Sequence, residues 1–273
     1  MSKTWERLQK TLQEHGLEPK KSLGQNFLVN DQTIEKIVGA AKETAAEWLL
    51  EIGPGPGALT EGLRHLAPHF QVIELDRNWA QHWRDQGLKV IEADALQIQW
   101  SELLNEAPST GIKSLVSNLP YQISSSLVID RCLDEKPFDF MILMFQKEVA
   151  QRIRARLEDP LYGMLSVVAQ SFWKIETLLD AGARDFFPPP KVASRVLIFR
   201  KLDSPVADRR RYLRFVKTAF VHPRKLMVSN LQEGFSIPRE KSLLILNRMG
   251  LAEKVRAEQL TVKQFIDFYH QLI

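Results

Sequence analysis

Short apolar runs alternate with helical patterns over the first two-thirds of this chain, and this alternation constrains the fold more than any other feature. The strand-like runs lie at Trp48–Ile52, Phe70–Leu75, Lys89–Glu92, Ser114–Ser117 and Phe138–Phe145. The helical patterns between them lie at Ala58–Leu66, Arg77–Gln86, Ser101–Asn105 and Ile123–Leu133. Alternation at this spacing predicts an α/β fold, with a parallel sheet and helices on both of its faces.

The pattern changes after a polar stretch at Lys201–Asp208. Beyond it, only helical patterns remain, at Arg209–Phe220, Arg224–Leu231, Glu240–Arg248 and Val262–Ile273. We therefore predict two domains: an α/β domain over residues 1–203 and a small all-helical domain over residues 204–273.

The composition is that of a soluble globular protein, with 44% hydrophobic and 26% charged residues among 273. A single cysteine, Cys132, excludes an internal disulfide and a multi-cysteine metal site. The six histidines show no metal-ligand spacing, so we predict no metal. No apolar run reaches the length of a membrane span. We expect a cytoplasmic protein and, because no coiled-coil pattern occurs, a monomer.

A glycine-rich loop follows the first predicted strand, where Gly53, Gly55 and Gly57 alternate with two prolines. Glycines at this position let the backbone approach a ligand closely. The spacing differs from that of dinucleotide-binding loops because Ala58 replaces the last glycine, and the loop lacks the lysine of a phosphate-binding loop. Gly53 and Gly55 therefore favour contact with a nucleoside that carries an amino-acid tail.

Acidic residues end the next two predicted strands. Glu74 is placed to bind both hydroxyls of a ribose, and Asp94 to accept a hydrogen bond from an adenine amino group. Each acid alone could be a helix cap. Together with the glycine loop at the same edge of the sheet, they predict S-adenosylmethionine as the cofactor.

The tetrapeptide Asn118–Tyr121 follows the fourth predicted strand. The Asn118 side-chain oxygen and the Leu119 carbonyl can accept both N–H bonds of an exocyclic amino group, and Tyr121 offers a face for a base to stack on. Such a turn alone is weak evidence of function. Phe186 is our candidate for the opposite face of the base, with a core aromatic as the alternative.

Basic residues concentrate near the start of the predicted helical domain. They are Arg209, Arg210, Arg211, Arg214, Lys217, Arg224 and Lys225, and further basic residues lie at Lys20, Lys21, Arg152, Arg154 and Arg156. A charge run is usually a solvated face. Beside an adenine-binding site, contacts with RNA phosphates become the better explanation.

Seven segments of the chain carry a family resemblance: Leu23–Leu28, Glu51–Gly55, Val72–Asp76, Asn118–Tyr121, Gln146–Val149, Pro188–Val192 and Arg224–Lys225. With them the chain resembles the ribosomal RNA adenine N6-dimethyltransferases, most closely the bacterial small-subunit (16S) branch linked to kasugamycin sensitivity. The resemblance implies a Rossmann-like class I methyltransferase sheet. It also implies cofactor contacts from Asn26, Leu28, Gly53, Glu74, Asp94 and Asn118.

The resemblance further implies methyl transfer to two adjacent adenosines in the 3′-terminal hairpin loop of 16S rRNA, within the small ribosomal subunit and with a role in its maturation. Departures from the family pattern fall at Ser117, Gln122, Ala193 and His222-Pro223. Three alternatives remain open at this point. They are a large-subunit rRNA methyltransferase of the antibiotic-resistance type, a ribosome assembly factor whose binding outweighs its catalysis, and a small-molecule N-methyltransferase.

Overall fold

The computed structural model describes residues 2–20, 23–108 and 110–272. Lys21 and Ile273, which the sequence places in a basic pair and in the last helix, lie outside these ranges. The chain forms two compact units. The α/β unit comprises the residues up to Val128, Asp134–Ala150 and Ile175–Lys201, and the helical unit comprises Ile129–Leu133, Gln151–Lys174 and the residues from Leu202 onward.

The division into units differs from the predicted boundary after residue 203, because the helical unit also takes two earlier segments. One of them carries α8 (Met164–Phe172), which packs against α9 (Arg209–Ala219) and α12 (Val262–Leu272). Helix α8 is apolar and largely buried, so its packing partners, rather than its position in the sequence, decide the unit to which it belongs.

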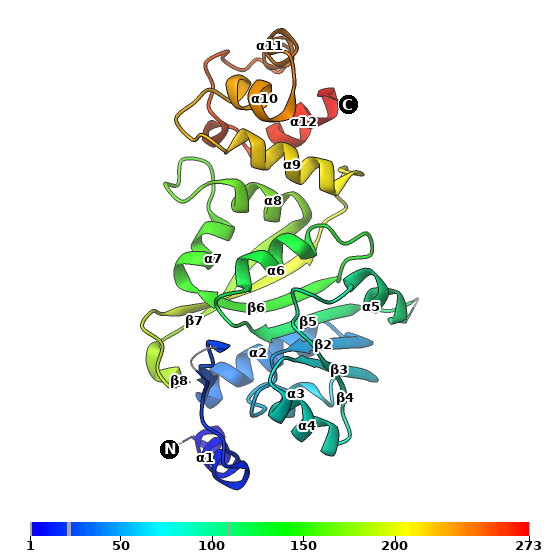
Figure 1. Cartoon of the computed structure of the whole chain (residues 1–273), viewed down its shortest axis with the longest axis vertical. Coiled ribbons are helices and arrows are strands. Elements are labelled where there is room, and N and C mark those ends of the chain that lie inside the picture. The colour runs from blue at the N-terminus through cyan, green and yellow to red at the C-terminus, as the bar shows by residue number, and fades with distance from the viewer. Residues whose placement is uncertain (1, 21–22, 109, 273) are drawn as a thin grey trace. The chain divides into compact units, whose positions relative to one another are not determined.

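In the described part of the chain, the α/β unit is built on a seven-stranded sheet with the order β4-β3-β2-β5-β6-β9-β7 (Figure 1). The strands are β2 (Trp48–Ile52), β3 (His69–Glu74), β4 (Lys89–Glu92), β5 (Lys113–Asn118), β6 (Phe140–Gln146), β7 (Trp173–Ala181) and β9 (Ser194–Lys201). Strands β2, β3, β4, β5 and β6 run parallel to one another, and β9 is antiparallel to β6. The predicted α/β class is confirmed.

The strand order places helices on both faces of the sheet. The chain moves from β2 outward to β3 and β4, then returns to the other side of β2 for β5 and β6. Because parallel crossovers are right-handed, the reversal puts the helices of the two halves on opposite faces. The connecting helices are α3 (Thr60–Leu63), α4 (Arg77–Asp85), α5 (Trp100–Glu106) and α6 (Ser124–Arg131). The direction changes between β2 and β5, where sheets of this kind bind ligands.

The central strands are buried on both faces, as parallel strands covered by helices require. Leu49, Leu50, Val72 and Val116 are fully buried. Helix α2 (Asp31–Glu43) precedes β2, and its N-cap is Asn30, which accepts a hydrogen bond from the Thr33 backbone. Asp31, the first residue of α2, accepts hydrogen bonds from the backbone of α1 (Lys3–His15).

Two short strands join the N-terminal part of the chain to a distant segment. Strand β1 (Phe27–Leu28) pairs antiparallel with β8 (Phe186–Phe187). Helix α1 packs beside them, where the rings of Trp5 and Phe187 meet edge to face at 4.8 Å. This pairing fixes the end of the segment that precedes β1.

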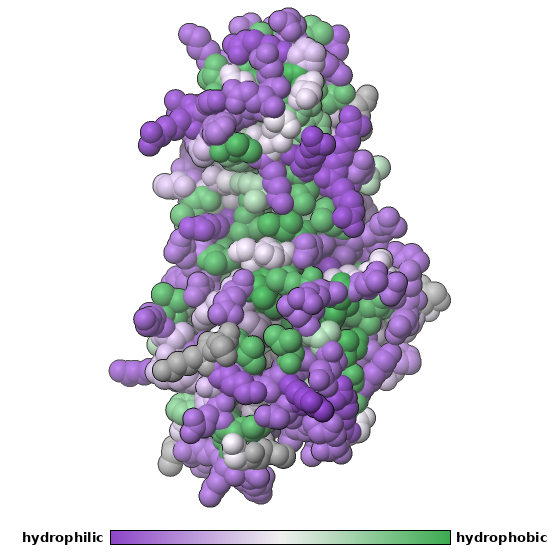
Figure 2. All heavy atoms as spheres, in the orientation of Figure 1, coloured by the Kyte–Doolittle hydropathy of each residue, from purple (hydrophilic) through white to green (hydrophobic). Residues whose placement is uncertain are grey.

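The helical unit has an aromatic core. Phe215 of α9 stacks on Phe268 at 5.8 Å and contacts Tyr269 at 5.6 Å, and both of these residues belong to α12. Helices α10 (Met227–Phe235) and α11 (Arg239–Arg248) complete the unit. Hydrophilic side chains dominate the part of its surface that is visible in Figure 2. No described helix of the protein is long and apolar enough to cross a membrane.

Candidate active site

A cavity of about 280 Å³ opens at the carboxyl ends of β2, β3 and β5, at the point where the strand order reverses. Its lining comes from five short segments: Leu23–Phe27, Ile52–Gly53 with Gly55, Ile73–Leu75, Ala93–Ala95 and Asn118–Ile123. Parallel strands bring these segments together because their carboxyl ends share one edge of the sheet.

The glycine loop is held tightly against its surroundings. Gly55 has φ +50, and Trp83 donates a hydrogen bond from Nε1 to the Gly55 carbonyl at 2.8 Å. At Gly57, with φ +90, a side chain would meet the Trp83 ring at 2.6 Å. Glycine is therefore required at these positions, and the loop backbone stays close to the cavity.

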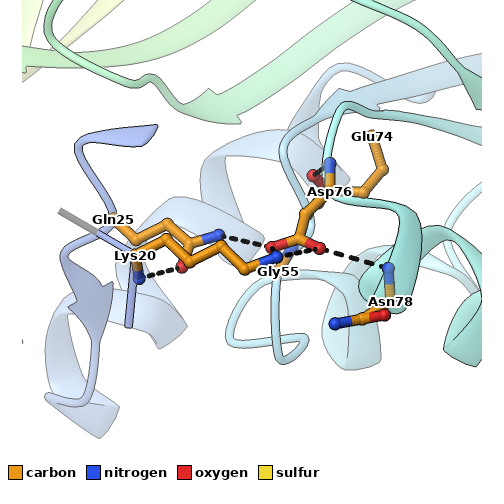
Figure 3. Close-up of polar contacts among 6 residues, drawn as sticks. All are labelled: Lys20, Gln25, Gly55, Glu74, Asp76 and Asn78. Carbon is orange, nitrogen blue, oxygen red and sulfur yellow. Dashed lines mark hydrogen bonds and ion pairs between the residues drawn. The ribbon is translucent and has the colours of Figure 1, made fainter. Parts of the chain in front are cut away.

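Glu74, at the end of β3, is buried, with 6% of its surface exposed. One carboxylate oxygen accepts the backbone N–H of Gly55 at 3.0 Å, and the other accepts that of Asp76 at 2.8 Å (Figure 3). Burial raises the pKa of this carboxyl, while the two backbone hydrogen bonds oppose the rise. Each oxygen retains acceptor capacity, which suits the two hydroxyls of a ribose.

Asp94 follows β4 and lies in a turn at the edge of the cavity. Its Oδ1 accepts the backbone N–H of Leu96 at 2.9 Å, so the side chain stabilises its own turn. The residue also lines the cavity and is half-buried. The second oxygen is the group that suits an adenine amino donor.

The Asn118 side chain is oriented by the segment that precedes β1. Its Nδ2 donates to the Asn26 carbonyl at 3.1 Å, and the Asn26 side chain donates in turn to the Gly24 carbonyl at 3.1 Å. Because the amide nitrogen of Asn118 is engaged in this way, its side-chain oxygen is the acceptor that remains for a ligand. Ser117 ties the end of β5 to β2 by donating to the Ile52 carbonyl at 2.6 Å.

Tyr121 is held at both its hydroxyl and its backbone. The hydroxyl lies 2.7 Å from the hydroxyl of Ser194 on β9, and the Tyr121 carbonyl accepts a hydrogen bond from Ser124 at 2.9 Å. Burial raises the pKa of the Tyr121 phenol. The ring is therefore neutral at physiological pH and fixed in orientation, while the residue still lines the cavity.

The structure brings eight of the ten predicted site residues to the cavity: Asn26, Gly53, Gly55, Glu74, Asp94, Asn118, Leu119 and Tyr121. Leu28 and Phe186 do not line it. They face each other across the β1–β8 pair, and both are buried in an apolar cluster with Ile37 and Ile142. For Phe186 the structure favours the core alternative over base stacking, since its ring would have to leave this cluster to reach a ligand.

Several residues of the site were missed by the reasoning from sequence. Gln25 and Leu75 both line the cavity, and Leu75 is 52% exposed directly after Glu74. An exposed leucine at a strand end is a usable signal for a ligand surface. Glu51 does not line the cavity but lies on β2 directly before Ile52, which does, and burial raises the pKa of Glu51 to about 8. The sequence signal for Glu51 is an acidic residue inside an otherwise apolar strand pattern.

Comparison with known proteins identifies the family. Residues 16–273 match the family described as ribosomal RNA adenine dimethylase. This chain belongs to that family. It is 51% identical to the ribosomal RNA small subunit methyltransferase A of Bdellovibrio bacteriovorus, over 98% of both chains. It is 32% identical to the protein of the same name from Natranaerobius thermophilus, over 94% of this chain and 93% of that protein.

Solved structures agree on the fold. A dimethyladenosine transferase from Plasmodium falciparum is similar with a TM-score of 0.76 and 24% identity, over 90% of this chain and 98% of that one. The 23S rRNA methyltransferase ErmE is similar with a TM-score of 0.65 and 25% identity, over 90% and 99% of the two chains. The predicted family, class I methyltransferase fold, enzyme class and cofactor are confirmed.

The residues of the cavity fit S-adenosylmethionine. Glu74 offers two acceptor oxygens for ribose hydroxyls, and the Gly53–Gly55 loop lets the backbone approach the ligand closely. Asp94 and Asn118 lie on the neighbouring strand ends with an acceptor oxygen each. Among the described residues, no group of three or more histidine, cysteine or acidic side chains could hold a metal ion.

Proposed function

We propose that the protein transfers methyl groups to N6 of two adjacent adenosines in the 3′-terminal hairpin loop of 16S rRNA, within the small ribosomal subunit. The observation that carries the proposal is the end of β5, where two acceptor groups and a fixed aromatic ring adjoin the cofactor cavity. The names of the relatives, which specify the small subunit, support 16S rRNA as the target.

The reaction requires that a poor nucleophile be made reactive. The lone pair of the adenine amino nitrogen is delocalised into the ring, and the bound cofactor supplies an electrophilic methyl group. Asn118 Oδ1 and the Leu119 carbonyl accept the two N–H bonds of that nitrogen. This holds the lone pair in the direction of attack and stabilises the positive charge that develops on the nitrogen.

Proton removal needs no dedicated base. The methylated nitrogen becomes strongly acidic and releases its proton to water. The neighbouring Tyr121 phenol does not take that proton, because its hydroxyl is protonated at physiological pH and bound to Ser194. Tyr121 instead stacks on an adenine that has been turned out of its RNA context.

Placement on RNA is assigned to the helical unit. Arg210, Arg214 and Lys217 are exposed on α9 at positions i, i+4 and i+7, so they form a single basic stripe. Arg209 differs from them, because it stacks on Phe172 at 4.6 Å and donates to the backbone of its own unit. The stripe suits phosphate contacts, whereas Arg209 stabilises the fold.

One experiment tests the function directly. Radiolabelled cofactor is offered with unmethylated small subunits, large subunits and free 16S rRNA, and the labelled base is mapped. We expect two labelled adenosines in the 3′-terminal hairpin of the small subunit, and no label with an Asn118→Ala variant. Label confined to large subunits would instead support the antibiotic-resistance type. Tight subunit binding without any label would support the assembly-factor alternative.

A further inference from the structure

Lys20, which precedes β1, reaches across to the turn that follows Glu74 (Figure 3). Its Nζ lies 2.9 Å from Oδ1 and 2.8 Å from Oδ2 of Asp76. Gln25 binds the same carboxylate at 3.3 Å and accepts the backbone N–H of Lys20 at 2.7 Å. The three residues thus contact one another pairwise, and Gln25 also lines the cofactor cavity.

Asp76 shapes the turn that presents Glu74. Its backbone N–H donates to a Glu74 oxygen at 2.8 Å, and its own carboxylate accepts the Asn78 N–H at 3.1 Å as the N-cap of α4. Asp76 is 4% exposed, so its charge is buried beside a second buried acid. The negative charge of Asp76 disfavours ionisation of Glu74, and Lys20 is the cation that contacts it.

We propose that Lys20 and Asp76 are positioning residues for the cofactor. Their ion pair joins the segment that carries Gln25 and Asn26 to the turn after β3, and it keeps the Glu74 side chain aimed into the cavity. This inference rests on the proposed function only in taking the cavity as the site of S-adenosylmethionine. Neither Lys20 nor Asp76 touches the reacting atoms, so their contribution is to cofactor affinity.

A second ion pair in the same unit provides a matched control. Lys201 and Asp139 lie 2.6 Å apart, with side chains 38% and 24% exposed, and neither lines the cavity. The Lys20 side chain is 44% exposed, so the two lysines are similarly accessible to solvent. The Lys20 partner is the more deeply buried, and removing the partner of a buried charge costs more than breaking an exposed pair.

The test measures binding of S-adenosylmethionine and of its demethylated product by calorimetry, on the full-length protein. Lys20→Gln is expected to weaken both affinities about five-fold, which corresponds to about 1 kcal/mol. Lys201→Gln should bind as the wild type does, and Lys20→Arg should retain most of the affinity. In turnover with small subunits, Lys20→Gln should raise KM for the cofactor and leave kcat nearly unchanged.

The outcomes separate this inference from the proposed function. If the wild type fails to bind the cofactor, the assignment of the cavity is wrong. If the wild type binds and Lys20→Gln binds equally well, the positioning role is wrong. Equal weakening by Lys20→Gln and Lys201→Gln also overturns it, because the effect would then follow net charge. Equal weakening by Lys20→Gln and Lys20→Arg overturns it as well, because the effect would then follow side-chain bulk and not the ion pair. Thermal unfolding without cofactor confirms that each variant is folded.

Discussion

Each of the two units contains a tyrosine hydroxyl that meets a serine hydroxyl, yet the two pairs have different surroundings. In the helical unit, Tyr212 and Ser171 lie 2.8 Å apart, and both are buried among aromatic rings. In the α/β unit, Tyr121 and Ser194 lie 2.7 Å apart, but Tyr121 is only half-buried and lines the cavity. The same interaction completes a core in one unit and fixes a ligand-facing ring in the other.

The contrast extends to asparagines. Asn230 of the helical unit is buried and donates to two backbone carbonyls, of Ala219 at 2.7 Å and of His222 at 3.1 Å. Asn118 donates to one carbonyl and lines the cavity, where its side-chain oxygen remains as an acceptor. Polar groups in the helical unit therefore serve packing, whereas those at the strand ends keep acceptor capacity for a ligand.

The largest effect is expected from Asn118→Ala. Loss of the side-chain acceptor should lower kcat at least about 100-fold, because this group stabilises charge that develops in the transition state. Asn230→Ala is the matched variant in the other unit. It should lower the free energy of unfolding by about 1–3 kcal/mol and leave methyl transfer per folded molecule unchanged. Full activity in Asn118→Ala would remove the basis of the mechanism.

Neutralising the basic stripe on α9 tests the division of labour between the units. The triple change of Arg210, Arg214 and Lys217 to Gln should weaken binding to small subunits about 10- to 100-fold. It should also reduce the slope of log affinity against log salt by about two to three. Cofactor affinity should stay the same. Changing the exposed Lys254 and Lys263 to Gln is the control, and an equal loss in that variant would indicate a general charge effect.

Glu51 tests how much the burial of an acidic side chain on β2 destabilises the α/β unit. Its pKa of about 8 lies above its ordinary 4.5, so the folded state holds a proton that the unfolded state releases. Stability is therefore lost as the pH rises from about 4.5 to about 8. Glu51→Gln should be more stable than the wild type at pH 8, by about 1–3 kcal/mol in denaturant unfolding, and the difference should vanish near pH 4.5. A difference independent of pH would exclude this origin.

Residues at strand ends could be predicted because the sequence alone places them. Gly53, Glu74, Asp94 and Asn118 each follow an apolar run, and parallel strands bring such positions to one edge. Phe186 could not be placed in this way, because in a short strand alternate residues face opposite sides and the sequence does not say which side is the core.

Contacts between distant segments could also not be predicted from the sequence. The pairing of Lys20 with Asp76 joins segments 56 residues apart, and a lysine before a strand gives no sign of its partner. The helical unit gathers α8 from the middle of the chain for the same reason, since burial of an apolar helix is decided by the neighbours it finds. Local patterns thus predicted the residue types at the site better than the long-range contacts that hold them in place.

The smallest effect returns to the two tyrosine–serine pairs. Ser194→Ala removes the partner of the Tyr121 hydroxyl, so the ring gains freedom and kcat should fall about three- to ten-fold, with little change in cofactor affinity. Tyr121→Phe should have a similar effect. Because both variants remove the same hydrogen bond, the double variant should be no worse than either single one, and this non-additivity is measured in a double-mutant cycle.

Ser171→Ala is the corresponding change in the helical unit, where it removes a hydroxyl of the same kind from a buried pair. It should lower the free energy of unfolding by about 1 kcal/mol and leave kcat unchanged, because Tyr212 lies in a core with no ligand to orient. If Ser171→Ala and Ser194→Ala reduced kcat equally, the Tyr121 pair would act through stability alone. A loss of kcat restricted to Ser194→Ala would instead show that an ordinary hydrogen bond between two hydroxyls becomes catalytically relevant when the ring it fixes faces the substrate.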